Sequence, residues 1–198
     1  GARLAGGRGL VHVDGHSDFT QAKSYATPET LGAAAGMDLA FASGRGEPLM
    51  TVWSGLEGPL AADADIVQIG ERGRDEPWFP DNYGDILATE ITQFTVQSAK
   101  SEGIDVTAAK TLARLEARGL DRAWLHVDVD VLDEKVMSAV DSPGSPGLDY
   151  EELAGLVRAL VSSGRIVGAD FAIYDPSRDP GHAHARGIVT CIAAGLLA

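Results

Sequence analysis

Residues 9–18 read GLVHVDGHSD, and residues 123–133 read AWLHVDVDVLD. In each stretch a short apolar run ends in a cluster of acidic residues. Short apolar runs of this kind are typical of strands buried on both faces of a parallel sheet. Ligands of open α/β sheets bind beyond the carboxyl ends of the strands. The two acidic clusters are therefore expected to meet at that edge of one sheet.

The rest of the chain extends this pattern of alternating elements. Further strands are predicted at 66–69 and 166–173, and the two stretches quoted above give strands at 9–13 and 123–127. Helices are predicted at 85–102, 107–118, 149–163 and 185–197, with Thr107 and Asp149 as the N-caps of the second and third. The Gly-, Ala- and Pro-rich segment 20–59 is predicted as loop with short helical pieces. Strands separated by helices predict a mostly parallel sheet with helices on both faces. We expect a single α/β domain over residues 1–198.

The amino-acid composition excludes several classes of protein. The chain has 198 residues, of which 44% are hydrophobic and 23% charged, as in a globular protein rather than a disordered one. Its 29 Asp and Glu against 16 Lys and Arg give a net charge of −13, which argues against binding to nucleic acid or to an anionic membrane. A single cysteine, Cys191, excludes intrachain disulfides and a zinc site built from cysteines. A cytoplasmic location is expected, because the sequence shows no apolar run long enough to span a membrane.

The acidic clusters have the composition of a metal site. Asp14, His16 and Asp18 are spaced by two residues, which keeps side chains of an extended chain on one face, and Asp128 and Asp130 repeat this spacing. Four carboxylates packed together would repel one another strongly, and two divalent cations would remove that repulsion. Ligation dominated by oxygen with one imidazole suits Mn²⁺. Either motif alone is more typical of a solvated loop or a helix cap, but the two together favour a metal site.

These motifs resemble those of the ureohydrolases, the family of arginase, agmatinase and formimidoylglutamase. VDGHSDF resembles their D-A-H-x-D motif, and HVDVDVLDEKVMSAVDSPGSPGLDYEEL resembles their D-x-D-x-x-D-P segment, Pro/Gly turn and following helix. The resemblance runs from about residue 9 to the end. It implies a three-layer α/β/α arginase-like fold, two Mn²⁺ ions and a homo-oligomeric enzyme acting on a small molecule. It also implies cleavage of a C–N bond in an amidine or guanidine by a metal-bridging hydroxide.

Position by position, the resemblance assigns functional residues. Asp14, His16, Asp18, Asp128 and Asp130 match metal ligands, with Asp18 and Asp128 also in catalysis. Substrate-binding positions match Asp75, Ser142 and Asp170. These three have plainer alternatives in a surface ion pair, a turn and a strand end. His12 and His126 lie within predicted strands, where a buried, hydrogen-bonded role is expected rather than ligation.

The sequence also departs from the family pattern. Ile173, in DFAIYDP, stands where the family has a Glu that pairs with the substrate guanidinium, and Ala35-Gly36 aligns with a family His-Gly pair. A further family His ligand, in a G-G-D-H-S motif, would precede the first residue, so the N-terminal part of the fold is expected to be missing. The isoleucine in place of the family Glu favours a substrate less cationic than arginine or agmatine, such as a formimino compound.

Two other functions remain open on the sequence. One is a non-catalytic arginase-fold protein, either metal-binding or structural. The other is a deacetylase-like hydrolase with a single zinc ion on a related fold. The complete set of D-x-H-x-D and D-x-D motifs favours two metal ions over one.

Overall fold

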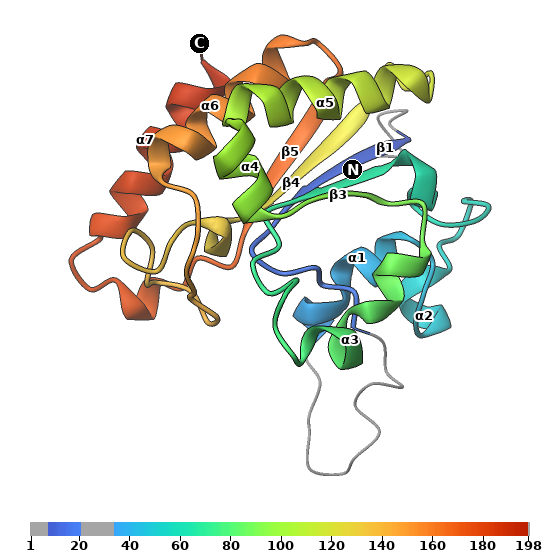
Figure 1. Ribbon diagram of the computed structural model, residues 1–198, viewed down its shortest axis with the longest axis horizontal. Helices are drawn as coiled ribbons and strands as arrows, with labels where there is room; N and C mark the ends of the chain where they lie inside the picture. Colours follow the sequence, from blue (N-terminus) through green and yellow to red (C-terminus); the bar gives the residue numbers. More distant parts are fainter. Residues whose placement is uncertain (1–7, 21–33, 198) are drawn as a thin grey trace.

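The computed structural model describes residues 8–20 and 34–197, and its centre is a sheet of five parallel strands (Figure 1). The strands are β1 (Gly9–Val13), β2 (Ile66–Ile69), β3 (Thr92–Phe94), β4 (Ala123–Asp128) and β5 (Ile166–Ala172), in the spatial order β3-β2-β1-β4-β5. All four neighbouring pairs are parallel, which confirms the predicted sheet. The predicted bounds hold for β1 and β2 and differ by one residue at the ends of β4 and β5.

Helices lie on both sides of this sheet, as predicted (Figure 1). The longer ones gather on one face and are α4 (Val96–Glu102), α5 (Ile104–Ala117), α6 (Tyr150–Ser162) and α7 (Ala183–Leu196). The shorter ones lie on the other side and are α1 (Asp38–Ala42), α2 (Pro48–Thr51) and α3 (Phe79–Asn82). The predicted loop at 20–59 contains α1 and α2, and its residues 21–33 lie outside the described part of the chain. Among the described residues, no helix has the length and apolar character needed to cross a membrane.

Alternation along the strands produces two hydrophobic cores. Val11 and Val13 of β1 and Leu125 of β4 are fully buried in the core beneath α4–α7. On the opposite face, Ile66 of β2 packs with Phe19 in a smaller core near α1 and α3. Successive side chains of a strand point to opposite faces, so β1 and β2 contribute to both cores: Leu10 lies against the smaller core, and Val67 of β2 belongs to the larger one.

The predicted helix at 85–102 is wrong. The segment instead forms a 3₁₀ turn at Gly84–Ala88, then β3, then α4. The residues Thr92 and Phe94 have side chains that favour strands, and β3 pairs with β2 at the edge of the sheet. Thr95 then starts α4, because its side chain accepts a hydrogen bond of 3.1 Å from the Ser98 backbone N–H.

The other helices follow the predictions more closely. At α6, the predicted cap is confirmed: the Asp149 carboxylate accepts from the Glu152 N–H at 2.8 Å, and the Glu152 carboxylate accepts from the Asp149 N–H at 2.9 Å. At α5, the helix starts at Ile104 rather than at a Thr107 cap. The Thr107 hydroxyl lies within the first turn and donates to the Gly103 carbonyl. The last predicted helix, 185–197, is α7, shifted by one or two residues at its ends.

Candidate metal centre

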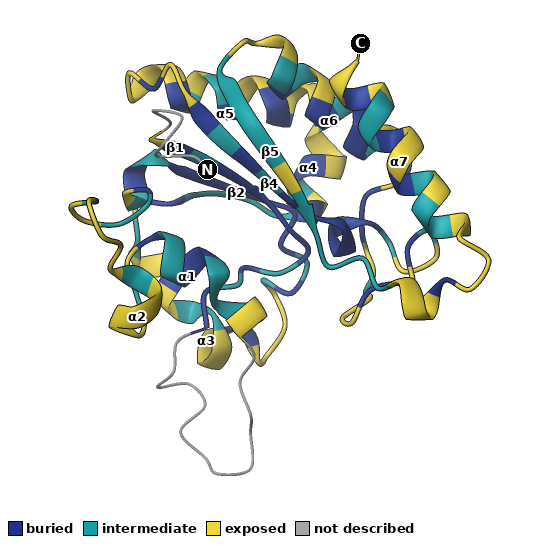
Figure 2. Ribbon diagram, turned by 180° about the vertical axis from the view of Figure 1, so that it is seen from behind, coloured by how far each residue is buried: buried dark blue, intermediate teal, exposed yellow. Residues whose placement is uncertain are grey.

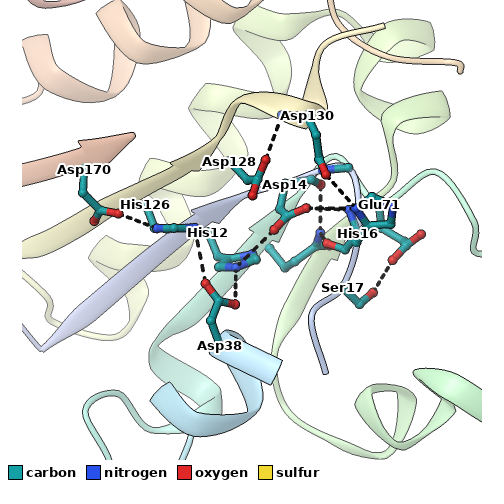
Figure 3. A network of polar contacts seen from close by, with 12 residues as sticks. His12, Asp14, His16, Ser17, Asp38, Glu71, His126, Asp128, Asp130 and Asp170 are labelled. Atoms are coloured by element: carbon teal, nitrogen blue, oxygen red, sulfur yellow. Dashed lines mark hydrogen bonds and ion pairs between the residues drawn. The ribbon is translucent and has the colours of Figure 1, made fainter. Parts of the chain in front are cut away.

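The two acidic clusters meet beyond the carboxyl ends of β1 and β4 (Figure 3). Val13 pairs with Val127, so Asp14 and Asp128 leave neighbouring strands at the same level. Ligand atoms of Asp14, His16 and Asp18 all lie within 4.8 Å of one another, and so do those of Asp14, Asp128 and Asp130. The five residues matched to metal ligands therefore form one cluster, with Asp14 common to both groups.

The turn after β1 orients its three side chains. Asp14 is buried, and its Oδ1 accepts a 2.7 Å hydrogen bond from the His16 backbone N–H, whereas its Oδ2 makes no hydrogen bond to any described residue. His16 Nδ1 lies 3.0 Å from Asp130 Oδ2, on the other side of the cluster. Asp18 has a φ of 43°, a left-handed conformation that Asp adopts more readily than most residues. This turn points both carboxylates and the imidazole toward β4.

Backbone contacts hold the β4 side of the cluster. Asp128 Oδ1 accepts from the Asp130 N–H at 2.8 Å and so caps the 3₁₀ turn that follows β4. Asp130 Oδ1 accepts from the Gly15 N–H at 3.2 Å. A Cβ at Gly15 would lie 1.9 Å from Nη2 of Arg72 and 2.9 Å from Asp130 Oδ1. A side chain at position 15 would therefore displace the ends of the Arg72 and Asp130 side chains from their present contacts.

Burial and mutual repulsion change the protonation of the cluster. Burial, followed by the charges of Asp14 and Asp130, raises the pKa of Asp128 to about 10. Burial and the charges of Asp14 and Asp38 raise the pKa of Asp18 well above its ordinary value. Burial opposes protonation of His16, but hydrogen bonds to Asp130 and Asp14 outweigh it and raise the His16 pKa to about 10. Protons thus provide the compensating charge that cations would otherwise supply.

A cavity of about 220 Å³ opens beside the cluster. Its walls are formed by His16, Asp18, Ala35, Gly36, Tyr83, Asp128, Asp130, Asp141, Ser142 and Ile173. The two departures from the family pattern, Ala35 and Ile173, therefore face the same space as the acidic cluster. Ile173 has a φ of 73°, which is rare for a β-branched residue and is found mainly where the surrounding structure enforces it.

The three predicted substrate-binding residues lie in different places. Ser142 is on the cavity wall. Asp75 is exposed and Asp170 is half-exposed, and neither is among the residues that line the cavity. Asp170 instead accepts a hydrogen bond from Trp124 Nε1 and lies 2.6 Å from Nδ1 of His126. The structure thus brings Ser142 to the cavity and leaves the other two outside it.

Sequence reasoning missed two residues that follow β2. Arg72 donates to the Asp130 backbone carbonyl and lies 4.0 Å from Asp130 Oδ1, and this charge helps to lower the pKa of Asp130. Glu71 is fully buried and accepts a 2.5 Å hydrogen bond from the Ser17 hydroxyl. The sequence feature that could have identified these two residues was their position at the carboxyl end of β2, the strand next to β1.

Comparison with known proteins identifies the family. The sequence pattern of the Arginase family matches residues 2–197 of the chain. The chain therefore belongs to the Arginase family.

Individual relatives agree with this assignment. A formimidoylglutamase from Aeromonas hydrophila is 35% identical over 66 residues, which are 33% of this chain and 21% of that protein. Arginase-1 of Oryctolagus cuniculus is 29% identical over 119 residues, 60% of this chain and 36% of that protein. The chain thus matches about a fifth to a third of the length of these relatives.

Solved structures show the same fold. A crystal structure of arginase from Bacillus subtilis superposes with a TM-score of 0.82 at 25% identity, over 95% of this chain and 62% of the arginase chain. Arginase from Bacillus caldovelox gives a TM-score of 0.78 at 26% identity, over 95% of this chain and 60% of the other. The predicted arginase-like α/β fold is confirmed.

Proposed function

We propose that this chain is a manganese-dependent hydrolase that cleaves a C–N bond in an amidine- or guanidine-type small molecule. The observation that carries the proposal is the convergence of Asp14, His16, Asp18, Asp128 and Asp130 beside a cavity of about 220 Å³. Membership of the Arginase family supports it. We further propose that residues 1–198 form one arginase-like domain, and that the whole protein is a homo-oligomer in the cytoplasm.

The chemistry of the five side chains fits manganese. Four carboxylates and one imidazole form an oxygen-rich donor set, which suits Mn²⁺ better than zinc. The buried Asp14 Oδ2 has no hydrogen-bond partner in the described part of the chain, and burying such an atom is costly unless a cation or donor contacts it. When bound by these residues, two manganese ions would neutralise the carboxylates and lower the pKa of a water molecule.

The chain's own residues then position the reaction. Asp130 holds the His16 ring in place, and Arg72 and Gly15 hold Asp130. Asp18 and Asp128 belong to both the cluster and the cavity wall, which supports a role in which their carboxylates, ionised when cations are bound, would accept the proton of the attacking water. Transfer of that proton to the leaving nitrogen completes the cleavage of the C–N bond.

The cavity wall favours a weakly cationic substrate. Ile173 offers no charge to a guanidinium, which would lose a charge-assisted hydrogen bond worth about 1.5–3 kcal/mol. That loss corresponds to roughly a ten- to hundredfold decrease in rate. The similarity to a formimidoylglutamase supports a formimino compound as the substrate.

Activity assays on the manganese-loaded protein test this function. We expect glutamate release from formimidoylglutamate to exceed urea release from arginine or agmatine. Ile173→Glu should raise urea release roughly tenfold or more, because it restores the missing carboxylate. Ile173→Gln is the control of matched size without charge and should have little effect. Arginase-level turnover of arginine by the wild-type protein would refute the proposed specificity.

A second candidate function is a non-catalytic, metal-binding member of the family. The hydrocarbon side chains of Ala35 and Ile173 on the cavity wall favour it. In that case the protein binds manganese but hydrolyses none of the three compounds. A single-zinc hydrolase, in contrast, would bind one metal ion per chain.

A further inference from the structure

A row of polar side chains crosses the sheet on the face opposite α4–α7. His12 of β1 pairs in register with Gln68 of β2 and with His126 of β4, and His126 pairs with Asp170 of β5. The His12 and His126 rings are stacked, with centroids 5.0 Å apart. Asp38, the first residue of α1, faces the Nε2 atoms of both rings (Figure 3). The row lies beside the acidic cluster, but its histidines are not among the residues that the motifs assign to that cluster.

Ligand atoms from this row converge on a second point. His12 Nε2 lies 3.1 Å from Asp38 Oδ1, and His126 Nε2 lies 3.3 Å from Asp38 Oδ2. His12 Nε2 also lies 3.7 Å from Asp14 Oδ2. Ligands bound at about 2.0–2.1 Å around a tetrahedral cation are about 3.3 Å apart. The observed separations of 3.1–3.7 Å match this spacing.

Two further observations point to a ligand rather than to a hydrogen-bonded cluster alone. The first is Asp14 Oδ2, which belongs to a side chain only 1% exposed, faces His12 and has no hydrogen-bond partner within residues 8–20 and 34–197. The second is the contact of 2.6 Å between His126 Nδ1 and Asp170 Oδ2. A carboxylate at one ring nitrogen fixes the tautomer and leaves the other nitrogen free to bind a metal. Trp124 Nε1 donates to the other oxygen of Asp170 and so holds this carboxylate in place.

We propose that His12, Asp14, Asp38 and His126 form an additional metal site that takes a cation of the zinc class. Two imidazoles and two carboxylates favour Zn²⁺ or its spectroscopic substitute Co²⁺ over Mn²⁺. The site joins β1, β4 and α1, and through Asp14 it adjoins the acidic cluster. Three of its four ligands lie outside that cluster. Metal binding at this site can therefore be tested separately from the proposed hydrolase activity.

Cobalt absorption of the metal-stripped full chain tests the site. The wild-type protein should bind one Co²⁺ at this site, in addition to any Co²⁺ in the acidic cluster, with the visible absorption of a four-coordinate N/O site. Added Zn²⁺ should abolish that absorption. His126→Ala and Asp38→Asn should weaken this binding by at least tenfold, and Asp170→Asn by about tenfold through the lost support of His126. Asp38→Asn preserves size at a partly exposed position, so it provides the test even where His126→Ala fails to fold.

Two control variants separate this site from other binding. His182→Ala removes an exposed histidine and should leave the absorption unchanged. Asp128→Asn alters the acidic cluster and should also leave it unchanged. The proposal is overturned if the wild-type protein gives no such absorption, or if Asp128→Asn abolishes it while Asp38→Asn and His126→Ala do not.

Discussion

At the scale of single residues, Asp128 shows how the site is balanced without metal. Its pKa of about 10 lies above its ordinary value of 3.8, and the pKa of His16 is raised from 6.5 to about 10. Between pH 3.8 and about 10 for Asp128, and between pH 6.5 and about 10 for His16, the folded protein holds a proton that the unfolded chain has released. The stabilisation is complete at low pH and is lost as the pH rises toward 10.

The thermal stability of the metal-stripped protein should therefore decrease as the pH rises. We expect the Tm of the wild type to fall between pH 6.5 and pH 9. Asp128→Asn should reduce the fall, because an amide cannot titrate and can still accept the hydrogen bond from the Asp130 N–H. Melts of both proteins across this pH range provide the measurement. Equal pH dependence in the two proteins would show that Asp128 does not hold a proton.

Residue types at fixed spacing made much of the cluster predictable. D-x-H-x-D and D-x-D each follow a strand, and the parallel pairing of these two strands brings the motifs together. Arg72 offered only its position after a strand as a signal. Asp38 could not be predicted, because its contacts with His12 and His126 depend on how distant segments pack. The positive φ of Ile173 is likewise fixed by tertiary structure and has no signal in the residue type.

At the scale of elements, the start of α6 depends on the paired contacts of Asp149 and Glu152. Asp149→Ala removes the side-chain acceptor and should lower the free energy of unfolding by about 1 kcal/mol. Glu116→Ala, at an exposed position in α5, is the control and should change it by less than about 0.5 kcal/mol. Urea unfolding measures both. A similar effect of the two variants would mean that the cap adds no stability.

The predicted helix at 85–102 is the large error among the predicted elements, in contrast to the correctly predicted cap at Asp149. Apolar residues in 85–102 have a spacing compatible with a helix, yet β3 forms there because Val67 and Ile69 of β2 offer an edge to pair with. Local periodicity does not report the partner strand. Asp149 and Glu152, in contrast, satisfy each other within one turn, and so the sequence alone was sufficient to predict that cap.

At the scale of the whole molecule, the larger core joins the sheet to α4–α7 (Figure 2). Leu125 of β4 is fully buried in it, and Leu125→Ala should lower the free energy of unfolding by about 2–5 kcal/mol. Leu87→Ala is the matched control, since that leucine is 54% exposed, and should have a much smaller effect. Denaturant unfolding of both variants provides the comparison. A loss below about 1 kcal/mol for Leu125→Ala would contradict the assigned core.

The central claim is that the acidic cluster beyond β1 and β4 binds manganese. Manganese content after loading and dialysis, measured on the wild type and on Asp128→Ala, tests it most directly. We predict two manganese ions per wild-type chain and a clear loss in Asp128→Ala, because a ligand is removed and the remaining carboxylates are less well neutralised. Equal manganese content in the two proteins would contradict the account.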